Sequence, residues 1–79
     1  MDESMVKRDV KYIGKHVYET RKHELNKTQE QFAELTDTSK DTISNIERGI
    51  VVPSMLCMVK ISNATNKTVD FFLIEDGCN

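Results

Sequence analysis

The polar residues between Lys40 and Arg48 have the types and the spacing of a surface that hydrogen-bonds nucleic acid. If this segment is helical, they fall on the side opposite Ile43 and Ile46. Their amide, hydroxyl and charged groups can bond the edges of bases or the oxygens of phosphates, and a helix carrying such a row fits the major groove of duplex DNA. The residues of this row are Asp41, Ser44, Asn45 and Arg48, with Lys40 at its edge.

Two short helices joined by a few polar residues are predicted to hold this row. The first runs from about Gln29 to Leu35 and follows Thr28, an N-cap residue that forms a capping-box pattern with Gln31. The second runs from about Lys40 to Glu47 and follows Ser39, whose hydroxyl can cap the helix start. We therefore predict a helix-turn-helix over about 28–48.

Further helices are predicted on both sides of this unit. Apolar spacing indicates a first helix from about Met5 or Asp9 to about His23, with Gly14 as a tolerated interior weakness. After Pro53, a fourth helix is expected from about Ser54 to Ala64 and a last one from about Val69 to Leu73. The fold class is therefore all-α, a compact bundle of about five short helices. The inward-facing residues predicted for the last two helices are Met55, Met58, Ile61, Val69 and Phe72.

Length and composition narrow the class of protein. The 79 residues allow one domain over 1–79, with flexible ends at 1–4 and 75–79. The net charge of -2 argues mildly against a strongly electrostatic nucleic-acid binder. No charged-then-apolar leader opens the chain and no apolar run could span a bilayer, so we expect a cytoplasmic protein without a membrane partner. Cys57 and Cys78 are interpreted as reduced thiols.

Basic residues crowd the first third of the chain. Most of them are interpreted as a solvated helix face. They are Lys7, Arg8, Lys11, Lys15, Arg21, Lys22 and Lys27.

Other chemistry finds little support in the sequence. His16 and His23 are seven positions apart with no cysteine near them, which argues against a zinc site. No nucleophile and base share a recognisable setting, and no glycine-rich phosphate loop occurs. We expect no metal, no cofactor and no enzymatic activity.

Four fragments of the chain resemble the phage-repressor (Cro-like, XRE-type) class of helix-turn-helix domains. They are IGKHV at 13–17, TQEQFAEL at 28–35, ISNIERG at 43–49 and the Pro-Ser pair at 53–54. The resemblance spans about 13–73, and the order and spacing of the fragments make it fairly specific. It implies a lambda-repressor-like domain that binds double-stranded DNA sequence-specifically and regulates transcription, most often by repression.

The resemblance also implies a role for each position of the polar row. Lys40, Asp41 and Asn45 match positions that face base edges, where Asn can bond adenine, Lys guanine and Asp cytosine. Asn45 is the strongest candidate. Asp41 could instead only favour the helix N-terminus through the helix dipole, and Lys40 could be a solvated surface lysine. Contacts to phosphate or sugar are expected from Gln29, Ser39, Thr42, Ser44 and Arg48.

Arg21 matches a family arginine that pairs with the glutamate of the ERG triplet, here Glu47. The interval from Arg21 to Thr28 is one residue longer than the common pattern, which leaves the register open. Lys22 could take the place of Arg21, or Glu47 could face water. Asp37 also departs from the family by standing where a glycine usually adopts a left-handed backbone.

Three apolar residues fall where the family commonly carries polar ones. They either fill a C-terminal core thinned by polar residues at Ser62, Thr65 and Lys67, or form an exposed patch that pairs two copies. Because the family often dimerises through this end, a homodimer on an inverted-repeat operator is our working hypothesis. The candidate dimer contacts are Leu56, Val59 and Phe71.

Two rival interpretations belong to other functional classes. The chain could be a protein-interaction module, such as the antitoxin of a toxin–antitoxin pair, which would bind a protein partner. It could also be a helix-turn-helix scaffold that has lost DNA binding, since the charge of the second helix is near neutral.

Overall fold

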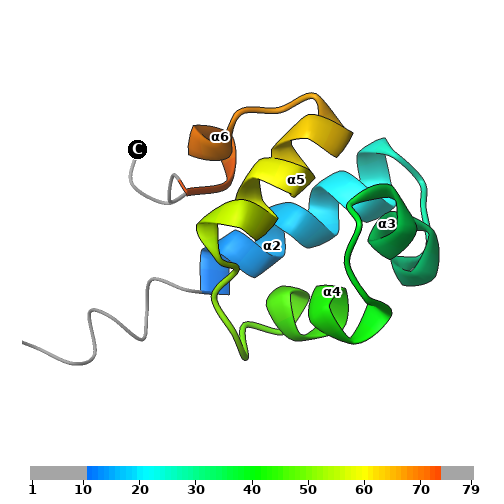
Figure 1. The fold of residues 1–79 in the computed structure, drawn as a ribbon, viewed down its shortest axis with the longest axis horizontal. Helices are drawn as coiled ribbons and strands as arrows, with labels where there is room; N and C mark the ends of the chain where they lie inside the picture. The colour runs from blue at the N-terminus through cyan, green and yellow to red at the C-terminus, as the bar shows by residue number, and fades with distance from the viewer. Residues whose placement is uncertain (1–10, 74–79) are drawn as a thin grey trace, which may run out of the picture.

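The computed structural model describes residues 11–73, which form a bundle of five α-helices and one π-helical turn (Figure 1). No strand occurs within this range, so the all-α prediction is confirmed. In Figure 1, α2 lies at the centre, with α3 and α4 on one side and α5 and α6 on the other. The elements in chain order are α2 (Lys11–Glu19), η1 (Thr20–Glu24), α3 (Gln29–Leu35), α4 (Lys40–Glu47), α5 (Met55–Thr65) and α6 (Val69–Leu73).

Local capping signals set most helix boundaries. The helices α3, α4 and α6 begin and end at the predicted residues, and α5 lies one residue later at each end. The Thr28 hydroxyl accepts from the Gln31 backbone N–H, while the Gln31 amide accepts from the Thr28 N–H, which completes the predicted capping box. The Ser39 and Ser54 hydroxyls cap α4 and α5 by accepting from the backbone N–H groups of Thr42 and Cys57. The early part of the predicted first helix and the two ends lie outside the described residues.

The hydrophobic core lies where all five helices meet. Residues from α2, α3, α4, α5 and α6 contribute, and Phe32, Ile43 and Phe72 are fully buried. The predictions for Met58, Ile61 and Phe72 are confirmed, and Val69 packs against the core while partly buried. The prediction for Met55 is wrong, because this first residue of α5 is 66% exposed. The buried face of α5 instead carries Cys57, Met58, Ile61 and Thr65.

Gly14 allows α2 to pack directly against the C-terminal end of α4. A Cβ atom at this position would lie 2.1 Å from the backbone oxygen of Ile46 and 2.9 Å from that of Glu47. Such distances are far below van der Waals contact, so any side chain would push the two helices apart. The interpretation of Gly14 as a tolerated weakness is therefore wrong, because its missing side chain allows the backbones of α2 and α4 to approach closely.

Polar residues in the C-terminal half satisfy their hydrogen bonds locally. The buried Thr65 hydroxyl donates to the Ile61 carbonyl at 2.8 Å, and the Ser62 hydroxyl donates to the Lys67 carbonyl. Lys67 also forms an ion pair of 2.8 Å with Glu24 of η1. Asn66 ends α5 in the left-handed conformation at φ 62°. The polar departures from the family pattern therefore leave few buried groups unsatisfied.

Candidate nucleic-acid interface

The turn between α3 and α4 brings the two helices into close contact. Asp37 adopts the left-handed conformation at φ 58°, as expected from the position of a family glycine. The Thr38 N–H donates to the Ala33 carbonyl at 2.8 Å, and its hydroxyl shares a 2.9 Å hydrogen bond with that of Thr36. Ala33 is buried where α3 meets the core, and its small side chain permits a short distance between the helices.

The outer face of α4 is accessible along its whole length. Ile43 and Ile46 point into the core, while the predicted polar row lies on the solvent side. Among the described residues, no side-chain hydrogen bond engages the Asn45 amide, so both its donor and its acceptor can face a base. Ser39, Lys40, Asp41 and Arg48 are exposed, and Thr42, Ser44 and Asn45 are partly exposed.

Three of the residues predicted to contact phosphate, Gln29, Ser39 and Thr42, have hydrogen-bond partners within the protein. The Ser39 hydroxyl accepts from the Thr42 backbone N–H at 3.1 Å and lies 2.9 Å from the Thr42 hydroxyl. The Gln29 amide nitrogen donates to Glu47 Oε1 at 3.0 Å, so this side chain is partly committed to holding α3 against α4. Any phosphate contact made by Gln29 would use its remaining amide groups or its backbone N–H.

Arg21 and Glu47 form a nearly buried ion pair behind this face. Arg21 Nε donates to Glu47 Oε2 at 2.6 Å and Nη2 donates to Oε1 at 3.1 Å. The two side chains are only 8% and 5% exposed. Arg21 Nη1 donates to the Lys27 carbonyl at 2.8 Å, and the guanidinium also lies over the Tyr18 ring. Together with Gln29, the pair joins η1, α3 and α4.

The π-helical turn η1 resolves the register that the sequence left open. The Leu25 N–H donates to the Thr20 carbonyl five positions earlier, rather than to the carbonyl four positions earlier. Such a turn takes up one additional residue inside a helix. The extra residue between Arg21 and Thr28 is thus accommodated without moving Arg21 away from Glu47. Lys22 does not replace Arg21; it is exposed.

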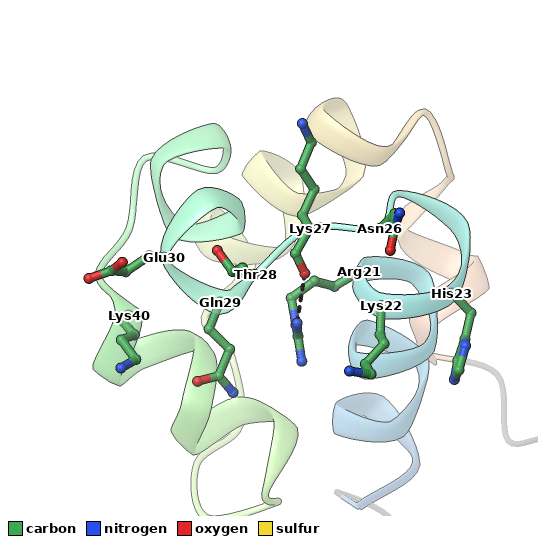
Figure 2. A pocket seen from close by; sticks show the side chains of 9 residues that line it. All are labelled: Arg21, Lys22, His23, Asn26, Lys27, Thr28, Gln29, Glu30 and Lys40. Atoms are coloured by element: carbon green, nitrogen blue, oxygen red, sulfur yellow. Dashed lines mark hydrogen bonds between the residues drawn. The ribbon is translucent and has the colours of Figure 1, made fainter.

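A basic hollow of about 640 Å³ lies beside the start of α4 (Figure 2). Side chains from η1, α3 and α4 surround it, and among its lining side chains the carboxylate of Glu30 is the one acidic group. We call this site the basic hollow. It escaped sequence reasoning because its residues come from η1, the loop after it, α3 and α4, which only the fold brings together. Its lining consists of Arg21, Lys22, His23, Asn26, Lys27, Thr28, Gln29, Glu30 and Lys40.

Apolar side chains are exposed where the chain leaves α4 and begins α5. Leu56 and Val59 are 66% and 40% exposed, so in the single chain they do not fill the core. Phe71 differs, because its ring packs near His16 and Phe72 while remaining partly exposed. Sequence reasoning missed the neighbours that continue this exposed stretch. We define the apolar surface as Ile50, Val51, Val52, Met55, Leu56 and Val59.

The Cys57 side chain contributes to the core. Burial raises the pKa of the Cys57 thiol, with the nearby charge of Lys60 acting in the opposite direction. Cys57 therefore packs as a protonated thiol. Within residues 11–73, no group of three His, Cys, Asp or Glu side chains could hold a metal ion. No helix in that range is long and apolar enough to cross a membrane.

The capped helix pair, its tight turn and the accessible polar face of α4 define a helix-turn-helix domain. A family model described as helix-turn-helix matches residues 17–72, which is more than half of the chain. The chain belongs to the XRE-type (Cro-like) helix-turn-helix family and is thus a DNA-binding transcription regulator of that type. No curated protein and no solved structure matched the chain in the comparisons.

Proposed function

We propose that this regulator is a repressor that reads a specific operator with α4. The observation that carries the proposal is the accessible polar face of α4, where the Asn45 amide is engaged by no other side chain among the described residues. Asn45 would bond adenine through two hydrogen bonds, and Lys40 and Asp41 would contact neighbouring base pairs. Repression follows if the operator overlaps a promoter.

Contacts to the DNA backbone would fix the register of α4 in the groove. Ser39, Thr42, Ser44 and Arg48 lie along the accessible side of α4, where phosphate and sugar groups flank an inserted helix. Gln29, at the start of α3, would add a contact from the supporting helix. These contacts would supply affinity that does not depend on base sequence.

We further propose that two copies bind an inverted repeat. The apolar surface is continuous in sequence with the end of α4, so pairing through it would hold the two α4 helices in a fixed relation. Exposed apolar side chains gathered in one region commonly mark an interaction site. In a two-fold dimer, the two helices would enter successive major grooves, with half-sites about 10 base pairs apart.

Selection of bound sequences from a random duplex pool at moderate salt tests this proposal. The expected result is an enriched inverted repeat with the half-site spacing given above. The enriched sequence, placed over a promoter in a reporter strain, should lower expression when the protein is present. If the folded protein enriches no sequence, specific DNA reading is wrong; if expression rises, the direction of regulation is wrong.

The apolar surface also supports a second candidate, an antitoxin-like interaction module. Ile50, Val52 and Leu56 are all more than half exposed and could bind a protein partner in place of a second copy. Co-purification of a stoichiometric small protein from the native host, lost in the Leu56→Glu variant, would favour this function. A chain recovered without such a partner would argue against it.

A further inference from the structure

We propose that the basic hollow clamps one phosphate of the DNA backbone and that Lys22 is a DNA-contacting residue. This inference rests on the proposed DNA binding and extends it to a residue that the polar face of α4 does not include. Lys22 belongs to η1, outside the helix-turn-helix, and its neighbour Arg21 is committed to Glu47.

One lysine lies on each side of the basic hollow. In Figure 2, Lys22 reaches in from η1 and Lys40 from α4, while the Arg21 and Gln29 side chains extend between them. All four residues line the same hollow. A phosphate there could be met by two ammonium groups at its edges, with the amide of Gln29 between them.

The charge balance of the hollow favours an anion. The charge of Arg21 is compensated by Glu47, and the Lys27 side chain points away in Figure 2, which leaves Lys22 and Lys40 against the single carboxylate of Glu30. Among the described residues, no acidic side chain forms an ion pair with Lys22 or Lys40. By contrast, Lys60 and Lys67 are paired, with Asp37 and Glu24 respectively. The lysines beside α4 therefore retain charge that an added phosphate can neutralise.

The position of the hollow identifies the phosphate as one on DNA. It adjoins the N-terminal end of α4, where Lys40 belongs both to the hollow and to the polar row that would face the bases. When a helix lies in the major groove, the sugar–phosphate backbone runs along its flank. Within η1, Arg21 pairs with Glu47 while its neighbour Lys22 stays exposed at the hollow.

Comparison of Lys22→Ala with Lys27→Ala tests the inference. Both variants remove one exposed lysine, from η1 and from the loop that follows it, but in Figure 2 the Lys27 side chain points away from the other lining side chains. Binding would be measured at several salt concentrations, on the selected operator and on an unrelated duplex. Lys22→Ala should weaken binding to both duplexes by a similar factor and reduce the slope of log K against log salt by about 1. Lys27→Ala should change the affinity and the slope much less, and Lys22→Arg should restore both.

Each other outcome has a distinct meaning. Equal effects of Lys22→Ala and Lys27→Ala would show that Lys22 acts only through net charge, and a loss confined to the operator would show base reading instead of phosphate binding. Either result overturns the clamp while leaving DNA binding intact. If wild-type protein binds neither duplex at low salt, the proposed function fails and the clamp with it. Titration with inorganic phosphate is a separate test, in which the chemical shifts of the backbone amides at 21–29 are followed. If these shifts change saturably while the Lys22→Ala variant binds DNA normally, the hollow binds a free anion and not a DNA phosphate.

Discussion

Arg21 donates two hydrogen bonds to Glu47, at 2.6 and 3.1 Å, across 26 positions of the chain. Because Glu47 is the last residue of α4, this ion pair fixes the end of α4 against η1. Gln29 donates to the same carboxylate and adds α3 to the connection. The three side chains thus form one nearly buried network that joins the end of α4 to η1 and α3.

Removal of one partner of this pair should destabilise the whole domain. Arg21→Ala leaves the Glu47 carboxylate nearly buried without its charge partner, which costs about 3–5 kcal/mol of the free energy of unfolding. Urea denaturation followed by circular dichroism would measure the loss. The neighbouring exposed Lys22→Ala serves as the control and should lie within about 0.5 kcal/mol of wild type. A loss for Arg21→Ala no larger than that of the control would contradict a buried, coupled pair.

Gly14→Ala should destabilise the domain although alanine is the better helix former. In an unconstrained helix the exchange would stabilise by about 1 kcal/mol. Here the added Cβ would lie 2.1 Å from the Ile46 oxygen, and displacing backbone in a packed core costs about 1–3 kcal/mol. The sign of the change in thermal midpoint decides between these effects. Lys15→Ala, at the adjacent exposed position, controls for helix propensity and should be nearly neutral or slightly stabilising. A rise in the thermal midpoint of Gly14→Ala would refute the close contact.

Local signals explain which parts of this structure could be predicted from sequence. The boundaries of α3 and α4 follow from Thr28, Ser39 and the spacing of Ile43 and Ile46, all of which act within a few residues. The polar row on α4 follows from the same periodicity. The outward position of Met55 did not follow, because helical spacing alone does not show where a helix leaves the core.

Features that depend on contacts between elements could not be read from spacing. An extra residue before Thr28 could be taken up by a loop or by a helix, and the i to i−5 bond of η1 has no sequence signature in this chain. The packing role of Gly14 depends on the carbonyls of α4, far along the chain. The basic hollow likewise exists only after η1, α3 and α4 have assembled.

The apolar surface should control self-association. Leu56→Glu places a charge in the proposed contact between two copies, so it should shift the protein toward monomer in sedimentation at micromolar concentration. Leu35→Glu is a matched control, because Leu35 is also an exposed leucine, at 49%, but lies at the end of α3. The control should leave the association unchanged. Wild-type protein that sediments as a pure monomer would contradict the dimer, and equal effects of both variants would remove its assignment to this surface.

Asn45→Ala should change which DNA sequences are bound, and Arg48→Ala should change only how tightly. The Asn45 amide offers a donor and an acceptor in the arrangement that adenine presents in the major groove, so its loss should cost about 1–3 kcal/mol on the operator. Discrimination should relax at one or two base pairs, while binding to unrelated duplex stays the same.

Arg48 lies at the exposed C-cap of α4, where a phosphate contact would strengthen binding to every sequence about equally. Binding measured on the operator, on single-base variants and on unrelated duplex separates the two patterns. A uniform loss for Asn45→Ala would assign that side chain to the backbone. A loss for Arg48→Ala confined to particular base pairs would make it a base-reading residue, because a phosphate carries no sequence information of its own.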